Sequence, residues 1–511
     1  MAGLLAYLSF VSLALAATLP TAATVRASIA RYLVKPLPSV ESIVGIPMPP
    51  ASPMLVVASF GDDGVAPGLD RGYAVGRTLN EVLFGAHESL DVEAMPYYIL
   101  DVSAPNVAAG LARDSRANAY RVAAREAAAW CAYGRVEGNV PSARVVVVVD
   151  DCKSGRRSER AFAVAADGEW PRVVAEACDY IVATAAGVSA RSRAACDRAR
   201  AIRSESFLAY AAFATTRGMP FERLQALVAA DPRFAPAVVD LIYRLPANSD
   251  KAAFLKEVEA LRVAADSTPA VALIAMSRQA SANAWKLEHR PLPALAVYIR
   301  AYPSLRAAWM LYASTLSSAV VYDYPAGTTA QTYKEDDTAD GCCYARNEAT
   351  HSAGLALSLA YYANRPQSYR ARWQMGYALM RYGLMLRGVA MWDKVPREGR
   401  VALEPLCALA DEFLAEALIA QPQAIALWNN RIVAQVHTHG NWMETFESAV
   451  ALHPKAQSLY ETAMEYSQQR WGGTEARRKL VEELAKKNNP GQPWTLMLRE
   501  RALWKRDRQE A

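Results

Sequence analysis

Residues 417–430 read ALIAQPQAIALWNN and residues 449–460 read AVALHPKAQSLY. In each stretch an apolar helical segment ends at a proline, and a second helical segment with an aromatic residue follows. Proline lacks a backbone N–H and disfavours helix in the residue before it, yet its φ angle suits the first turn of a helix. The pattern therefore predicts antiparallel helices that are paired across proline-containing turns.

The same junction recurs along the chain. It lies at Pro232, Pro303, Pro366, Pro422 and Pro454, and the helices that follow carry Phe234, Ala307 with Trp309, Trp373, Trp428 and Tyr460. The prolines are separated by 71, 63, 56 and 32 residues, and only the last interval fits the period of about 34 residues of tetratricopeptide (TPR) repeats. We therefore predict an irregular TPR-like α-solenoid over residues 200–511, built from stacked helix pairs.

The run Trp471-Gly472-Gly473 lies near the end of this region. With Trp428 and Trp442, it resembles a bacterial TPR-like family of unknown function that is marked by a terminal Trp-Gly-Gly motif. The resemblance covers about residues 290–490 and implies an α-solenoid without a known reaction; Gln469 stands where the family usually has proline. Glycine adopts positive φ and ends helices, so Trp471 is expected to pack across a turn, with ligand contact as the alternative.

A different pattern precedes the helices. Met54–Phe60 is a buried-strand sequence, five consecutive valines lie between Arg144 and Asp150, and Trp170-Pro171 is typical of a helix start. These signals predict an α+β domain over residues 54–190, with a mixed sheet and helices.

The order of these segments resembles the TolB-like N-terminal domain found ahead of TPR arrays. The resemblance is carried by Leu55–Phe60, Tyr133–Gly138 and Val145–Asp151 with its Lys153-Ser154-Gly155 turn, although Ala58-Ser59-Phe60 departs from the usual Leu-Pro-Phe. It implies an interaction or sensory module rather than an enzyme.

The N-terminus predicts export to the periplasm or cell envelope. Residues 1–25 contain the apolar run Leu4–Ala17 and are interpreted as a signal peptide. The first basic residue, Arg26, follows the run instead of preceding it, so an uncleaved membrane anchor and a cytoplasmic protein stay open as alternatives. Residues 26–53 contain six prolines after residue 31 and are predicted to form an extended linker.

Charge and cysteine content narrow the classes of partner. The formal net charge is +5 over 511 residues, which predicts no nucleic-acid partner. Basic residues from Arg477 to Arg508 are interpreted as a solvated helix face, with contact to anionic lipid or polyanion as the alternative. The seven cysteines have irregular spacing and form no Cys-x-x-Cys pair. Either Cys131 faces Cys152 on a neighbouring strand and forms a disulfide, or the thiols are buried and free.

Asp62 and Asp63 lie in the glycine-containing stretch Gly61–Gly64, between a predicted strand and a predicted helix. Phosphate-binding loops occur at such places, but two aspartates repel phosphate and no nucleotide-binding motif is present. Weak calcium binding is the alternative to a polar loop.

Two further stretches contain metal-ligand residue types. Glu348 and His351 have the Glu-x-x-His spacing of di-iron bundles, which require a second copy. His437 and His439 are two residues apart and do not share a helix face. Since no catalytic motif is present either, we predict no catalytic, metal or cofactor-binding residue and no enzyme.

The function expected from these observations is protein binding. An acidic, turn-rich insertion over residues 322–344 carries Tyr333, Glu335, Asp336 and Asp337, and long loops are often functional. Trp373, Trp428 and Trp442 are further candidate contacts, although most aromatic residues of the array are expected to fill its core. We expect an exported scaffold or adaptor that binds a protein through the array; a carbohydrate- or peptidoglycan-binding module is the alternative, and an enzyme with an unrecognised site is the third. Membrane contact is expected only through an uncleaved N-terminal segment.

Overall fold

The computed structural model describes residues 19–63, 70–85, 91–94, 115–212, 219–246, 251–265, 268–282, 291–318, 348–387, 395, 397–438, 440–468, 471–498 and 500. The chain divides into two compact units. The first, which we call the sheet unit, comprises residues 44–284 and 288–312; the array unit comprises residues 1–43, 285–287 and 313–511. A mixed sheet with helices is followed by a long helical stretch, which confirms the predicted fold class.

A five-stranded mixed sheet forms the centre of the sheet unit, in the order β2-β1-β3-β4-β5. Its strands are β1 (Met54–Asp62), β2 (Asp91–Ala94), β3 (Trp130–Glu137), β4 (Ala143–Asp151) and β5 (Arg157–Val164). β1 is parallel to β2 and β3, whereas β4 is antiparallel to β3 and β5. All five valines of β4 are buried, because successive side chains point to opposite faces of the sheet and helices cover both faces.

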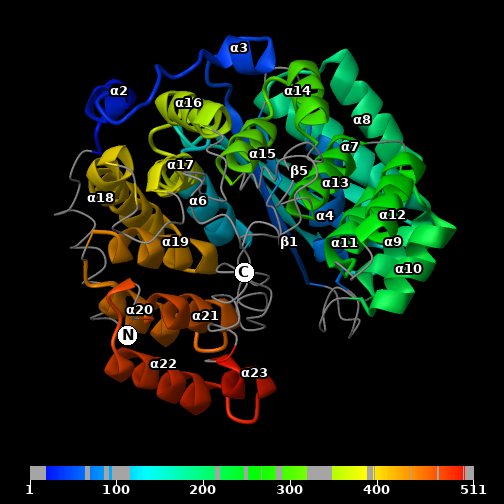
Figure 1. Cartoon of the computed structure of the whole chain (residues 1–511). Coiled ribbons are helices and arrows are strands. Elements are labelled where there is room, and N and C mark those ends of the chain that lie inside the picture. The colour runs from blue at the N-terminus through cyan, green and yellow to red at the C-terminus, as the bar shows by residue number, and fades with distance from the viewer. Residues whose placement is uncertain are drawn as a thin grey trace. The chain divides into compact units, whose positions relative to one another are not determined.

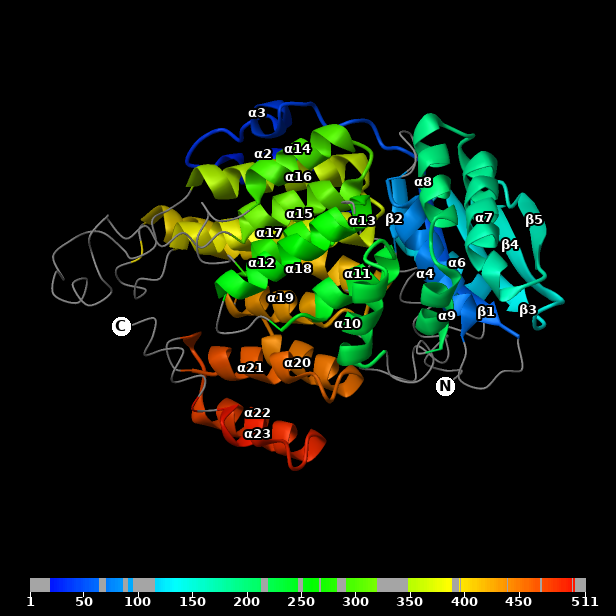
Figure 2. The same cartoon turned by 90° about the vertical axis from the view of Figure 1, so that its right-hand side faces the viewer.

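Helices lie on both faces of this sheet. α6 (Ser115–Glu126) covers the face that carries Val56, Cys131 and Val148. α4 (Arg71–Leu83) and α7 (Trp170–Ala185) pack against each other. The connection from β1 to β2 runs along the sheet in one direction, and the connection from β2 to β3 runs in the opposite direction. Because such connections between parallel strands are right-handed, α4 and α6 lie on opposite faces of the sheet. The sheet is thereby a middle layer (Figure 2).

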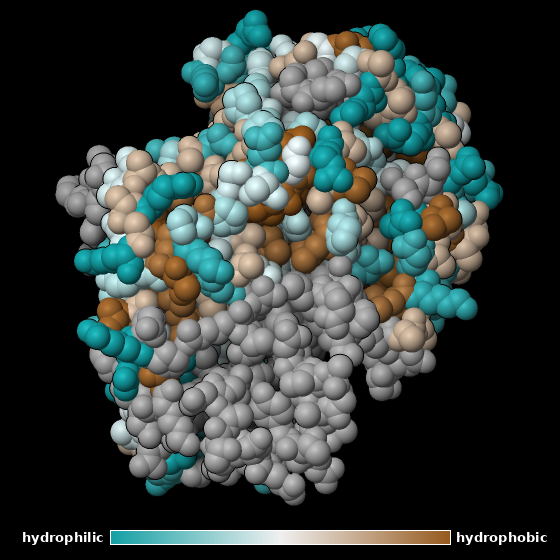
Figure 3. Space-filling view, turned by 45° about the horizontal axis from the view of Figure 1, so that its top comes forward, coloured by the Kyte–Doolittle hydropathy of each residue, from teal (hydrophilic) through white to brown (hydrophobic). Residues whose placement is uncertain are grey.

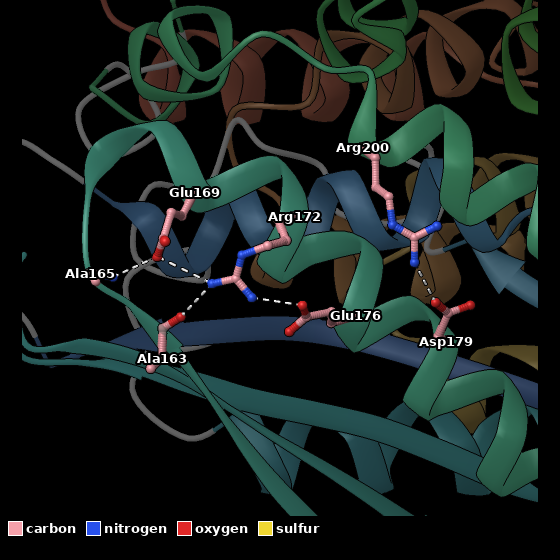
Figure 4. A network of polar contacts seen from close by, with 7 residues as sticks. All are labelled: Ala163, Ala165, Glu169, Arg172, Glu176, Asp179 and Arg200. Carbon is pink, nitrogen blue, oxygen red and sulfur yellow. Dashed lines mark hydrogen bonds and ion pairs between the residues drawn. The ribbon is translucent and has the colours of Figure 1, made fainter.

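One arginine orients the start of α7 against the end of β5. Arg172 donates to the carbonyl oxygen of Ala163 at 3.1 Å and pairs with Glu176 at 2.7 Å. Arg172 also pairs with Glu169 at 3.2 Å, and the Glu169 carboxylate accepts a hydrogen bond from the Ala165 N–H (Figure 4). These side chains are well exposed, so the network orients the start of α7 but contributes little to the free energy of unfolding.

Short helices make up the rest of the sheet unit. They are η1 (Asp167–Glu169), α8 (Ala190–Arg200), α9 (Ser204–Ala211), α10 (Phe221–Ala230), α11 (Ala235–Arg244), α12 (Lys251–Ala264), α13 (Pro269–Ala282), α14 (Leu292–Ala301) and most of α15 (Arg306–Ser317). The unit that holds the sheet thus extends to Tyr312, well beyond the change from strands to helices near residue 190.

The array unit is built from consecutive helices that pack on their neighbours in the chain. They are α16 (Glu348–Asn364), α17 (Tyr369–Arg387), α18 (Arg397–Ala420), α19 (Ile425–Val436), α20 (Trp442–Leu452), α21 (Gln457–Tyr466), α22 (Glu475–Asn488) and α23 (Pro493–Leu496). From α18 onward they lie in successive layers, which end at α22 and α23 (Figure 1).

The segment predicted as an extended linker contains helices. α2 (Ala22–Ala30) buries Val25 and Ile29, four residues apart on one helix face, and packs against α16. The Tyr362 hydroxyl donates to the carbonyl oxygen of Pro20 at 3.0 Å. α3 (Val40–Val44) follows. The prediction of a wholly extended linker was wrong here, because α2 ends before the first of the six prolines and α3 occupies the proline-free stretch between Pro38 and Pro47.

The apolar run Leu4–Ala17 lies outside the described residues. Across the described part of the chain, no helix combines the length and hydrophobicity needed to cross a bilayer.

Candidate functional site

Three of the five proline junctions share one kind of hydrogen bond that sequence reasoning did not foresee. The indole N–H of Trp309 donates to the carbonyl oxygen of Pro303 at 2.9 Å, and that of Trp428 donates to Pro422 at 2.8 Å. The Tyr460 hydroxyl likewise lies 2.9 Å from the Pro454 carbonyl oxygen. In each case the aromatic residue is six positions after the proline. The side chain therefore closes the turn between two helices, and the aromatic residues expected after the prolines are largely structural.

Neighbouring junctions are also joined to each other in the array unit. His453, which precedes Pro454, places its Nε2 atom 3.1 Å from the carbonyl oxygen of Pro422. Asn489 donates from its side-chain amide to the carbonyl oxygen of Pro454 at 2.9 Å. Each of these two carbonyl oxygens thus has partners both within its own junction and in the next one. We call this chain of contacts the proline-carbonyl ladder; it holds α18–α23 in register.

The second of these contacts reveals a junction that the sequence analysis missed. Asn489 precedes Pro490, and the Gln492 N–H donates to the Asn489 carbonyl at 3.2 Å. The same backbone turn occurs where the Ala456 N–H meets the His453 carbonyl at 3.1 Å. Pro490 lies 36 residues after Pro454, close to the TPR period. The signal was present as Asn-Pro, but the following Gly491 reads as an ordinary loop.

At Pro366 an arginine takes the place of the aromatic residue. Arg372 is six positions later and donates from Nε to the Pro366 carbonyl at 3.0 Å. The predicted residue, Trp373, is the next residue along the helix and is half-buried. Its side chain does not close the junction, so among the predicted tryptophans it offers the most surface to a partner.

The other two predicted tryptophans are buried. Trp428 is 9% exposed and Trp442 is 5% exposed, with the Arg477 guanidinium 5.7 Å from the Trp442 ring centre. Little of either ring remains for a partner to contact. Tyr333, Glu335, Asp336 and Asp337 lie outside the described residues.

Trp471, Gly472 and Gly473 form the turn between α21 and α22. The N–H groups of Trp471 and Gly473 both donate to the Gln468 carbonyl at 3.0 Å. Gly472 has φ +73°, whereas a Cβ on Gly473 would lie 2.0 Å from the Ser467 carbonyl oxygen. The two glycines therefore serve different needs: the first provides a left-handed conformation and the second provides space.

The Trp471 ring lies in a cluster drawn from the ends of three helices. Its centre is 5.5 Å from that of His437 and 5.4 Å from that of Tyr466. The Arg387 guanidinium carbon lies 4.8 Å above it, which is within cation–π range. These contacts favour the packing role expected for Trp471, since its neighbours come from α17, α19 and α21.

The residues weighed as metal ligands do not converge. Arg71 donates to both carboxylate oxygens of Asp62, at 3.1 and 2.9 Å, so this carboxylate is already paired. Glu348 lies 3.8 Å from Lys35. His439 lies outside the described residues. Within the described part of the chain, no three His, Cys, Asp or Glu side chains are grouped as a metal site would require.

Cys131 and Cys152 are neighbours, as expected from adjacent strands, and both are free thiols. The Cys152 N–H donates to the Ala129 carbonyl at 2.9 Å just beyond the end of β4. The contact with Cys152, together with burial, raises the pKa of Cys131.

Next to these thiols is a buried carboxylate. Asp150 is fully buried, and its Oδ2 atom accepts the hydroxyls of Tyr120 and Tyr133, each at 2.8 Å. Burial and the adjacent carboxylate raise the pKa of both tyrosines. Asp150 therefore joins α6 to two strands through neutral donors.

A second buried polar cluster connects α4 with the helices that follow the sheet. Arg77 pairs with Glu81 and with Asp240, each at 3.1 Å. The Tyr210 hydroxyl donates to the other Asp240 oxygen at 2.6 Å. Burial raises the pKa of Glu81 to about 7, against the opposing effect of Arg77. Sequence patterns could not reveal this cluster, because α4, α9 and α11 meet only in the folded chain.

The raised pKa of Glu81 makes the stability of the protein depend on pH. The unfolded carboxyl ionises near 4.5, whereas the folded one stays protonated up to about 7. The folded state binds more protons in this window, so the free energy of unfolding is expected to fall by about 3 kcal/mol as pH rises through it.

Urea unfolding at pH 5 and pH 8, followed by circular dichroism, measures this change. Glu81→Gln is expected to remove most of it, while the exposed control Glu205→Gln retains it. Equal pH dependence in Glu81→Gln and in the unmodified chain would contradict the assignment.

Comparisons of the chain with models of protein families, with curated proteins and with solved structures found no match.

Proposed function

We propose that the protein is an adaptor of the bacterial envelope, whose TPR-like helical array binds another protein. The proline-carbonyl ladder is the observation that carries the proposal. It connects the junctions at Pro422, Pro454 and Pro490 through side chains, so that α18–α23 keep a constant relation to one another. Stacked helix pairs of this kind present an extended surface of fixed shape, which suits recognition of a protein segment.

The TPR-like assignment is supported by spacing at the junctions. In TPR repeats a tryptophan near the start of one repeat follows the proline that ends the previous one. Trp428 and Tyr460 stand in that relation to Pro422 and Pro454. Gly376, four residues after Arg372, has the Ala410 carbonyl oxygen 2.9 Å from the position of an added Cβ, as expected for the small residue at which paired helices approach.

The α/β part is proposed to be a TolB-like contact module. Three segments on which that resemblance depends, in β1, β3 and β4, are adjacent strands of one sheet. Residues distant in the sequence therefore contribute to one local structure, which is what a shared domain fold requires. Export is proposed on the apolar run Leu4–Ala17 alone.

Protein binding is favoured over glycan binding by the placement of the aromatic residues. A sugar ring stacks on an aromatic face that is open to solvent, whereas Trp309, Trp428 and Trp442 are at most 9% exposed and Trp373 is half-buried. On the face shown in Figure 3, hydrophobic residues form separate patches among hydrophilic side chains. Non-obligate protein interfaces are usually mixed polar and apolar surfaces of this kind.

The adaptor proposal predicts that the acidic insertion controls partner binding. The variant Glu335→Lys, Asp336→Lys, Asp337→Lys is expected to recover at least about tenfold less partner from an envelope extract, since reversed charges repel a complementary surface. The measurement is quantitative mass spectrometry of proteins that co-purify with the full chain.

The matched control reverses two exposed carboxylates of the sheet unit, Glu205→Lys and Glu222→Lys, and should leave the partner yield unchanged. Equal partner yields from the insertion variant and the unmodified chain, or no specific partner in any sample, would count against the proposal.

A further inference from the structure

Two buried cysteines face each other between α7 and α8. The Sγ atoms of Cys178 and Cys196 lie 2.8 Å apart, and both residues are fully buried. A disulfide bond has a sulfur–sulfur distance of about 2.05 Å, so the sulfurs need to approach by less than about 1 Å. Both are free thiols in this structure.

The two helices are held in the register that this pairing needs. Ser189 caps α8 in a reciprocal arrangement with Ser192, with distances of 3.2 and 2.9 Å, which fixes the turn after α7. Arg200, one turn beyond Cys196, pairs at 2.9 Å with Asp179, the residue after Cys178 (Figure 4).

Small residues allow α7 and α8 to lie close together. Ala175, Ala195 and Ala199 are fully buried on these helices. The sulfur contact thus results from helix packing and capping together, and it does not depend on a flexible loop.

A metal site is the main alternative use of two adjacent thiols. Structural zinc takes four ligands from cysteine and histidine. In the described residues no third Cys, His, Asp or Glu joins this pair in a metal-binding group. The pair is therefore better suited to bond formation between its own sulfurs.

We propose that Cys178 and Cys196 form a disulfide when the chain folds in the presence of an oxidised small-molecule disulfide such as oxidised glutathione. One cysteine thiolate attacks the glutathione disulfide, forms a mixed disulfide and releases one glutathione. The second cysteine loses its proton and attacks the protein sulfur of that mixed disulfide, which releases the other glutathione. The two cysteines lose two protons and two electrons, and one glutathione disulfide becomes two glutathione molecules.

This bond would connect the last helix of the α/β domain to the first helix of the helical region. Because both thiols are buried, exchange takes place during folding or when α8 separates transiently from α7. The bond closes a loop that restricts the unfolded chain, so the oxidised protein is the more stable form.

Peptide mapping tests the pairing directly. The full chain is refolded in a glutathione redox buffer, alkylated with iodoacetamide and digested with trypsin. Cleavage after Arg172, Arg191, Arg193 and Arg198 is expected to give residues 173–191 joined to residues 194–198, and a reductant should separate them. Alkylation of both cysteines, or a bond from either one to Cys131 or Cys152, would overturn the proposal.

Thermal unfolding with and without reductant provides the second measurement. The oxidised chain is expected to melt on the order of 5 °C above the reduced chain. Cys178→Ser and Cys196→Ser should each abolish this difference, whereas Cys407→Ser, which changes a buried thiol on α18, should retain it. The double variant Cys178→Ala, Cys196→Ala preserves apolar packing if the serine variants fail to fold. A full reductant-dependent shift in that variant would contradict the assignment.

Discussion

Gly473→Ala is expected to destabilise the array unit by about 3 kcal/mol or more. The added Cβ would lie 2.0 Å from the carbonyl oxygen and 2.1 Å from the carbonyl carbon of Ser467. These are backbone atoms, so the clash cannot be relieved by a change of rotamer. The turn between α21 and α22 must open, which disturbs the hydrogen bond from Gly473 to Gln468. Overpacking of this kind costs about 1–3 kcal/mol in a well-packed site and more where backbone must move.

Gly472→Ala is the matched control for this prediction. Its Cβ would have no neighbour within 4 Å, but φ is +73° at this position. The cost is therefore limited to about 1–2 kcal/mol for a left-handed residue with a side chain. Urea midpoints from circular dichroism would compare the two variants. A cost for Gly472→Ala equal to or above that of Gly473→Ala would show that conformation, rather than space, governs the motif.

Trp428→Ala is expected to cost about 3–5 kcal/mol. The substitution removes a buried indole and leaves a cavity between α19 and its neighbours. It also removes the indole donor to the Pro422 carbonyl oxygen. His453 would then be the remaining ladder residue in contact with that oxygen. Since the ladder joins successive junctions, we expect loss of order to extend toward α20 and α21, which hydrogen exchange of their amides would detect.

Two comparisons separate packing from hydrogen bonding at Trp428. Trp428→Phe keeps most of the apolar volume and should cost about 1–2 kcal/mol, mainly for the lost indole hydrogen bond to the Pro422 carbonyl. Trp373→Ala should cost less than Trp428→Ala, because the Trp373 ring is half-buried and does not close a junction. If Trp373→Ala instead proves the more damaging of the two, the structural role assigned to Trp428, six positions after Pro422, is wrong.

The proline-carbonyl ladder indicates a structural role for aromatic residues of the array. From the sequence, most of them were expected to fill the core of the repeats, and some to line a binding groove. Trp428 and Tyr460 each use their polar atom on a proline carbonyl, so these side chains hold the array together. Trp309 makes the same contact within the sheet unit. Partner contact is then expected from other residues, such as those of the acidic insertion identified from the sequence.

Several features could be predicted because their signals act over a few residues. The proline at each junction constrains its own φ and the residue before it, whatever the rest of the chain does. Five adjacent valines favour a buried strand for similarly local reasons, and Trp170-Pro171 favours a helix start. The fold class and the positions of the helix breaks follow from such residues. The linker prediction failed at α2. The many prolines after residue 31 suggested an extended chain, although Val25 and Ile29 have the spacing of one helix face.

Other features were decided only by the tertiary structure. Arg77 meets Asp240 across 163 residues, and Cys178 meets Cys196 only once α8 folds back on α7. At Pro366, Arg372 rather than Trp373 donates to the proline carbonyl and closes the junction. In each case the sequence determined which side chains were available, while the path of the chain determined which of them came within bonding distance. Hydrogen bonds and sulfur contacts act over only a few ångströms, so they are decided after the helices have packed.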